Sequence, residues 1–149
     1  MSGNDDEDEY SPEMLARMSG MIRDFVPHNA ALGLDVIRVS RGHVWVRLPY
    51  AEKLVGNPAT GALHGGAMSS AMDAAAGLAV MARIGRPGSI ATLDLRIDYM
   101  RAALRGQDVV VRADCYKVTR HVCFVRGVAY TTDENDAVAS LSATFARKS

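Results

Sequence analysis

Asn57-Pro58-Ala59-Thr60-Gly61-Ala62-Leu63-His64-Gly65-Gly66 leads directly into an apolar run from Ala67 to Ala82, and this combination decides the fold. The run is rich in Ala, Met and Leu, which favour helix, and it is apolar on almost every side. A helix of this kind is buried over most of its surface. The sequence therefore predicts a long central helix with the rest of the chain wrapped around it.

Asp73 is the only charged residue in this apolar run. At about 3.6 residues per turn it shares one side of the helix with small residues only. These residues are Gly66, Ser69, Ser70 and Gly77. No Lys or Arg lies three or four positions away, and an uncompensated buried carboxylate destabilises a fold. Asp73 is therefore a candidate functional residue. The alternatives are a contact with a hydroxyl group, a contact with an arginine from another segment, or exposure to water through a gap.

Gly65 and Gly66 fall at the predicted start of the helix, where the first backbone N–H groups have no partner within the helix. Without a Cβ atom, these residues let a ligand oxygen come close to the backbone. Together with the helix dipole, the two amides can stabilise a carbonyl oxygen that gains negative charge. A tight turn is the alternative explanation for two adjacent glycines, and the nearby Asp73 favours a ligand site.

The motif His64-Gly65-Gly66 followed by Asp73, with Asn57 in the preceding loop, resembles the active-site stretch of the hotdog-fold acyl-CoA thioesterases. The resemblance is greatest to the phenylacetate-pathway (PaaI-like) and thioesterase superfamily member 2-like branch. It covers about residues 28 to 146, and residues 87–100 are similar to the strand that follows the helix in this family. The resemblance implies hydrolysis of acyl-CoA thioesters to a free acid and coenzyme A.

The resemblance also implies roles for five residues. Asp73 would attack the thioester carbonyl as a nucleophile or deprotonate a water molecule as a general base, and both options stay open. The Gly65 amide would be the oxyanion donor, and Asn57 would position the attacking group. His64 would orient the loop or lie near the thiolate leaving group, and a structural hydrogen bond at the helix start is the alternative. In this family Asp73 and Thr92 of one subunit would meet Asn57, His64 and Gly65 of the other.

Other residues are expected to bind the substrate. On the helix these are Gly66, Ser69 and Ser70. Arg101, Arg105 and Arg120 are candidates for the coenzyme A phosphates, because the planar guanidinium group binds phosphate bidentately. No feature of the sequence distinguishes an aryl group from a medium-chain or long-chain fatty acyl group.

The rest of the chain predicts one α+β domain. Residues 1–10 are expected to form an acidic disordered tail and residues 11–149 a single domain that begins with a helix over 11–26. Alternating apolar residues predict two strands before the central helix and four after it. These lie near 34–39, 44–48, 91–99, 109–115, 123–129 and 137–145. Within 91–99, the residues expected on a buried face are Ala91, Leu93, Leu95, Ile97 and Tyr99.

The resemblance supplies the arrangement of these elements. In the hotdog fold a curved antiparallel sheet wraps around the central helix, and subunits pair edge to edge as a dimer or as a dimer of dimers. The chain is therefore expected to be a homo-oligomer, with the homotetramer as one form. Pairing would also cover an exposed sheet edge, which is a liability for a single subunit.

Several functional classes are disfavoured by the composition. The formal net charge is zero and no basic cluster with interleaved aromatic residues is present, so we expect no nucleic-acid partner. The longest apolar run is too short to span a bilayer, which predicts a cytoplasmic protein without a membrane partner. Cys115 and Cys123 lack metal-site spacing and are expected to be buried free thiols, so no metal and no cofactor are expected.

Three alternatives to a thioesterase remain. A non-catalytic acyl-CoA-binding hotdog protein would keep the fold and the pocket without hydrolysis. A hotdog hydratase or dehydratase is disfavoured because its usual His-Phe-Pro-Gly or Asp-x-x-x-x-His pattern is missing from the sequence. A purely structural oligomer would leave Asp73 unexplained.

Overall fold

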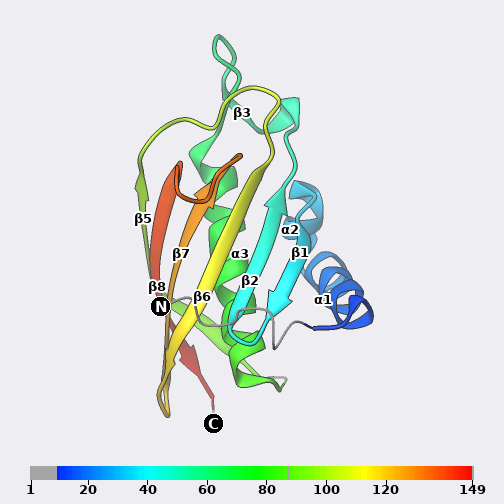
Figure 1. The fold of residues 1–149 in the computed structure, drawn as a ribbon, viewed down its shortest axis with the longest axis vertical. Helices are drawn as coiled ribbons and strands as arrows, with labels where there is room; N and C mark the ends of the chain where they lie inside the picture. The colour runs from blue at the N-terminus through cyan, green and yellow to red at the C-terminus, as the bar shows by residue number, and fades with distance from the viewer. Residues whose placement is uncertain (1–9, 87, 149) are drawn as a thin grey trace.

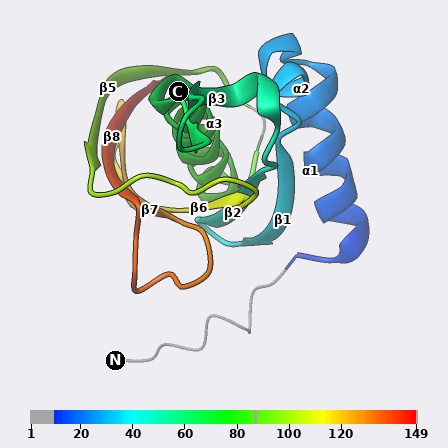
Figure 2. The ribbon, with the colours of Figure 1, turned by 90° about the horizontal axis from the view of Figure 1, so that it is seen from above.

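A curved antiparallel sheet surrounds one long helix in the computed structural model, which describes residues 10–86 and 88–148 (Figures 1 and 2). Residues 1–9 of the predicted acidic tail lie outside the described residues. The elements in chain order are α1 (Pro12–Asp24), α2 (Pro27–Leu32), β1 (Asp35–Ser40), β2 (His43–Leu48), a short 3-10 helix (Glu52–Leu54), β3 (Val55–Asn57), β4 (Ala62–Leu63), α3 (Gly65–Ile84), β5 (Ile90–Tyr99), β6 (Val109–Val118), β7 (Val122–Tyr130) and β8 (Ala139–Arg147).

The main sheet has six strands in the order β1-β2-β6-β7-β8-β5, and every neighbouring pair is antiparallel. Seen from above in Figure 2, the sheet curls around α3, while α1 and α2 lie outside β1. Strands β1 and β5 are the two edges of the sheet, and β3 and β4 form a separate small hairpin. The predicted α+β class, with a sheet around a central helix and an extra N-terminal helix, is confirmed.

Helix α3 begins and ends at residues suited to those positions. His64 is the N-cap, and its Nδ1 accepts a hydrogen bond of 2.8 Å from the Gly66 N–H. Gly85 ends the helix in the left-handed conformation with φ of 70°, which glycine adopts without a steric penalty. Between these ends the small side chains of alanine let the helix pack closely against the sheet. None of the helices in the described part of the chain combines the length and apolarity needed to cross a membrane.

Helix α1 is fixed to the outer edge of the sheet. Its Ser11 N-cap accepts a hydrogen bond from the Met14 N–H, and Pro12 occupies the first helical position. The buried Ser19 hydroxyl donates to the Val36 carbonyl and accepts from the Val36 N–H, both at 3.1 Å. Helix α1 ends at Asp24, two residues before the predicted end at residue 26, and Pro27 opens the second short helix α2.

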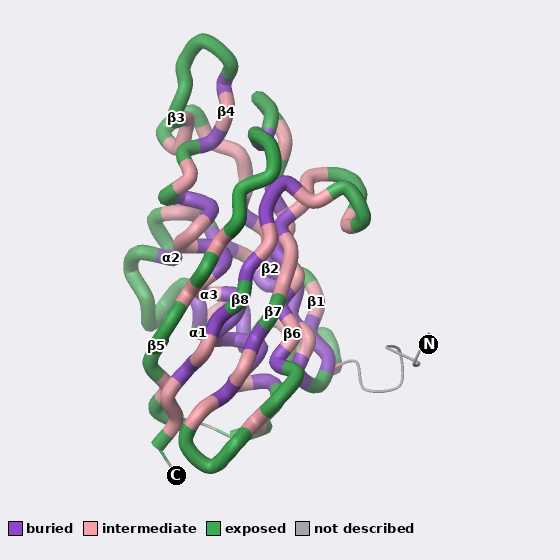
Figure 3. Tube along the Cα trace, turned by 90° about the vertical axis from the view of Figure 1, so that its left-hand side faces the viewer, coloured by how far each residue is buried: buried purple, intermediate pink, exposed green. Residues whose placement is uncertain are grey.

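Strand β5 differs from its predicted burial. None of its ten residues is buried, and it is coloured intermediate or exposed along its length in Figure 3. The register shifts between Thr92 and Asp94, so the intervening Leu93 bulges out and is 59% exposed. Tyr99 is 51% exposed. The alternating pattern predicted the strand correctly and its inner face only in part, because Leu95 and Ile97 are half-buried against the core whereas Ala91, Leu93 and Tyr99 are exposed.

Candidate active site

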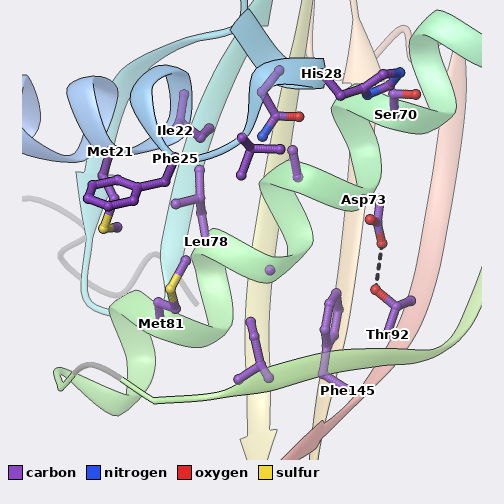
Figure 4. Close-up of a pocket in the computed structure, with 15 residues that line it drawn as sticks. Met21, Ile22, Phe25, His28, Ser70, Asp73, Leu78, Met81, Thr92 and Phe145 are labelled. Atoms are coloured by element: carbon purple, nitrogen blue, oxygen red, sulfur yellow. Dashed lines mark hydrogen bonds between the residues drawn. The ribbon is translucent and has the colours of Figure 1, made fainter.

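Asp73 lies in the middle of α3 and is half-buried. The Thr92 hydroxyl, at the beginning of β5, donates a hydrogen bond of 2.8 Å to Asp73 Oδ1 (Figure 4). Across residues 10–86 and 88–148, no cationic side chain forms an ion pair with this carboxylate. Of the alternatives for Asp73, the hydroxyl contact is therefore present and the arginine contact is not.

A cavity of about 670 Å³ opens beside Asp73, between α1 and α2 on one side and α3, β5 and β8 on the other. Its polar end contains Asp73 and Thr92 together with Ser70 and His28 (Figure 4). The remainder is lined mainly by apolar side chains, including Met21, Phe25, Leu78, Met81, Ile90 and Phe145. Pockets for small ligands have volumes of roughly 300–1,000 Å³ with few polar groups. The cavity therefore suits an apolar ligand with one reactive polar group.

The start of α3 presents one backbone donor and not two. The Gly66 N–H donates to His64 Nδ1, so the Gly66 amide is already occupied. The Gly65 N–H donates no hydrogen bond to any of the described residues. The Tyr99 hydroxyl donates a hydrogen bond of 2.8 Å to the Gly65 carbonyl and supports this turn of backbone. The amide available to a ligand is therefore that of Gly65.

Ser69 and Ser70 both donate hydrogen bonds to the Gly66 carbonyl, at 3.0 and 2.9 Å. Ser70 lines the Asp73 cavity and also a smaller cavity of about 270 Å³ next to His64 and Gly66. His28 at the start of α2 lines both cavities as well. The two ends of the predicted site on α3 thus open into adjoining cavities, although they lie more than two helical turns apart.

The remaining predicted site residues do not lie beside Asp73 within one chain. Asn57 lies in the exposed β3–β4 hairpin, where its Oδ1 accepts a hydrogen bond from the Ala59 N–H, and it lines neither cavity. Arg105 pairs with Glu52 at 3.1 Å and donates to the Pro58 carbonyl, so it holds this hairpin. These contacts stabilise the hairpin.

The other two candidate arginines lie away from Asp73 as well. Arg101 pairs with Asp136 at 3.1 Å. Arg120 is exposed in the turn between β6 and β7, and Figure 1 shows this turn at the opposite end of the molecule from the start of α3. Arg120 is therefore remote from the start of α3 within one chain.

His28 and Tyr99 have positions at the site that the sequence did not mark as functional. Tyr99 belongs to a predicted strand, and its contact with Gly65 depends on tertiary structure. His28 belongs to a helix of six residues that is too short to show a periodic pattern. Within the described ranges, no three His, Cys, Asp or Glu side chains gather closely enough to hold a metal ion.

Comparison with known proteins gives matches over most of the chain. Residues 60–138 match the thioesterase superfamily. A candidate esterase of Halobacterium salinarum is 39% identical over 90 residues, with 58% of each chain covered. The medium/long-chain acyl-CoA thioesterase YigI of Escherichia coli is 30% identical over 136 residues, which cover 80% of this chain and 84% of YigI.

Solved structures agree with these matches. A crystal structure of a Pseudomonas aeruginosa protein has a TM-score of 0.81 and 36% identity, covering 91% of this chain and 99% of the other. The PaaI protein of the Escherichia coli phenylacetic acid degradation operon has a TM-score of 0.78 over 93% of this chain and 97% of its own. PaaI is 18% identical, so it supports the shared fold alone.

Proposed function

Since this chain belongs to the thioesterase superfamily and has the hotdog fold of PaaI-like thioesterases, we propose that it hydrolyses acyl-CoA thioesters to a free acid and coenzyme A. The observation that carries this proposal is the Asp73 carboxylate at the polar end of an apolar cavity. One of its oxygens is bound by the Thr92 hydroxyl. The other oxygen remains available to act on a thioester carbonyl placed in the cavity.

Asp73 can act in either of two ways. As a nucleophile, its free oxygen attacks the carbonyl carbon, the coenzyme A thiolate leaves, and water then hydrolyses the resulting anhydride. As a general base, it takes a proton from water, and the hydroxide attacks the same carbon. Both routes place negative charge on the carbonyl oxygen. The Gly65 amide is the donor that stabilises this charge, and one such donor contributes about 3 kcal/mol.

The distance along α3 supports a site shared between two subunits. Gly65 and Asp73 are eight residues apart, so their backbones lie about 12 Å apart along the helix axis. A single carbonyl group cannot contact both, because an oxyanion donor must approach the oxygen to about 3 Å. The Gly65 amide that works with Asp73 therefore comes from a partner subunit. On this basis Asn57 and His64 of the partner also approach Asp73, and the oligomer is a dimer or a dimer of dimers.

The test measures thiol release from acyl-CoA thioesters by the wild type and by Asp73→Asn. The substitution keeps the size of the side chain and removes its charge, so kcat should fall by about 10²–10⁴-fold, the range typical of a lost acid–base group. An unchanged melting temperature serves as the control for folding. A non-catalytic acyl-CoA-binding protein would bind the thioester and leave it intact in both forms, which would refute the proposal.

A further inference from the structure

A third cavity of about 500 Å³, called the distal cavity below, lies between α1 and the last turns of α3, away from Asp73. Most of its lining comes from these two helices, and it includes Tyr10, Met14, Arg17, Met18, Ala82 and Gly85. Met21 and Met81 line this cavity and also the cavity beside Asp73. Figure 4 shows both methionines at the end of the Asp73 cavity that is remote from the carboxylate. The two cavities are therefore neighbours that share these two methionine side chains.

The cavity beside Asp73 has room for an acyl group of moderate length. Asp73 and Met81 both line it and are eight residues apart on α3, which corresponds to about 12 Å along the helix axis. A carbon–carbon bond is about 1.5 Å long, and an extended chain advances by less than this at each bond. The distance from Asp73 to Met81 therefore holds at least about eight chain carbons, and a longer chain meets the methionines.

The two methionine side chains shared by the cavities are flexible, whereas the helices that carry them, α1 and α3, are held in place. Methionine is unbranched and has three rotatable bonds, so its side chain moves aside easily to admit an apolar ligand. The helices behind the two methionines are held in place. Ser19 bonds α1 to Val36 of β1, and the Tyr10 hydroxyl donates to the Ala82 carbonyl of α3 at 3.2 Å.

We propose that Met21 and Met81 form a movable partition in a single acyl channel, and that the cavity beyond them holds the distal part of long-chain acyl groups. The assignment rests on the proposed function, because it places the thioester carbonyl at Asp73. It lets the protein accept long fatty acyl chains that extend from the Asp73 cavity into the distal cavity. Helix α1 supplies one wall of the distal cavity and thereby sets the longest chain that is accepted.

The test compares binding of octyl-CoA and hexadecyl-CoA thioethers, which resemble acyl-CoA thioesters and cannot be hydrolysed. In Met21→Trp the indole ring fills the partition, so the Kd for the hexadecyl compound should rise about tenfold or more, since each methylene excluded from an apolar pocket costs roughly that factor. The Kd for the octyl compound should stay within about twofold. The kcat/KM for palmitoyl-CoA should fall by a similar factor, whereas the kcat/KM for octanoyl-CoA should stay close to that of the wild type.

Arg23→Trp is the matched control, because Arg23 is exposed on the same helix and lines neither cavity. It should leave both Kd values unchanged. Met81→Phe tests the partition from the opposite helix and replaces Met21→Trp if that variant does not fold. If the Kd rises equally for both thioethers, or for neither, the proposed channel is refuted. Wild-type protein that binds the thioethers selectively but hydrolyses no thioester would instead refute the proposed function and leave the channel intact.

Discussion

At the scale of single residues, Thr92 controls how the Asp73 carboxylate is oriented. Its hydroxyl donates to one oxygen at 2.8 Å, no other described residue donates a hydrogen bond to this carboxylate, and the second oxygen is the one proposed to act on the substrate. We predict that Thr92→Val, which keeps the shape and removes the donor, lowers kcat by about tenfold or more, because a hydrogen bond to a charged group is worth about 1.5–3 kcal/mol. Thr92→Ser keeps the hydroxyl and should remain close to the wild type. Equal kcat values for the Val and Ser variants in the thiol-release assay would contradict this orientation.

Cys115 gives a second prediction at this scale, on stability. Burial, with a smaller effect of the neighbouring Cys123, raises the pKa of the Cys115 thiol from 9.0 to about 11. The unfolded chain therefore loses this proton at lower pH than the folded chain does. The contribution to stability is complete below pH 9 and is lost as the pH rises from 9 to about 11.

The measurement is the free energy of unfolding of the wild type and of Cys115→Ala at several pH values. The difference between the two proteins should be constant below pH 9 and should shrink between pH 9 and 11. Curves that stay parallel over this range would show that the thiol titrates alike in the folded and unfolded chains.

The site residues differ in how far the sequence could reveal them. Asp73 was identifiable because no cation lies at helical spacing from it, and the structure brings none to it among the described residues. The family resemblance placed Thr92 in the same site, but the hydrogen bond between Thr92 and Asp73 joins two elements and was not predicted. The contact of Tyr99 with Gly65 spans 34 positions and has no signature in local spacing. Pairing of this kind depends on how the elements pack.

At the scale of elements, the start of α3 combines a structural cap with the proposed oxyanion donor. His64 Nδ1 binds the Gly66 N–H, which is the usual task of an N-cap side chain. His64→Asn should preserve the cap, because Asn is among the best N-cap residues, whereas His64→Ala should lower the free energy of unfolding by about 0.5–2 kcal/mol.

Denaturant unfolding and kcat together separate the two roles of His64. If the imidazole serves only as a cap, His64→Asn retains both stability and kcat. If it also acts near the leaving thiolate, His64→Asn keeps its stability and loses kcat. A destabilised Asn variant would contradict the capping role itself.

Elements with a long, regular pattern were predictable, and short or irregular ones were not. The six strands of the main sheet and α3 were expected from alternation and composition, and all are present. Helix α2 and the β3–β4 hairpin contain too few residues for a period to show. In β5, the bulge at Leu93 interrupts the alternation and changes which side chains are buried.

At the scale of the whole molecule, β5 leaves one sheet edge open. Its exposed Leu93 and Tyr99 place apolar surface along this edge, beside the Thr92 that binds Asp73. An unpaired edge with exposed apolar residues invites pairing with another chain. Pairing of two β5 strands would also supply the partner's Gly65 amide that the spacing along α3 requires. The proposed active site therefore requires the proposed oligomer.

Gly65→Pro is a variant designed to remove the proposed oxyanion donor alone. Proline has no backbone N–H and is well tolerated at the first position of a helix, which Gly65 occupies. The preceding His64 has ψ of 134°, an extended value suited to the residue before proline. A Cβ at Gly65 would make only an ordinary contact of 3.5 Å with the Tyr99 ring.

The most direct test of the shared site is complementation between Asp73→Asn and Gly65→Pro subunits. Each variant alone should be nearly inactive, since every site lacks either the carboxylate or the amide. Co-expression forms mixed dimers in which one site combines intact Asp73 with intact Gly65 from different chains, so thiol release should recover to about a quarter of the wild-type rate. Mixed dimers that form but remain inactive would contradict a site built from two subunits.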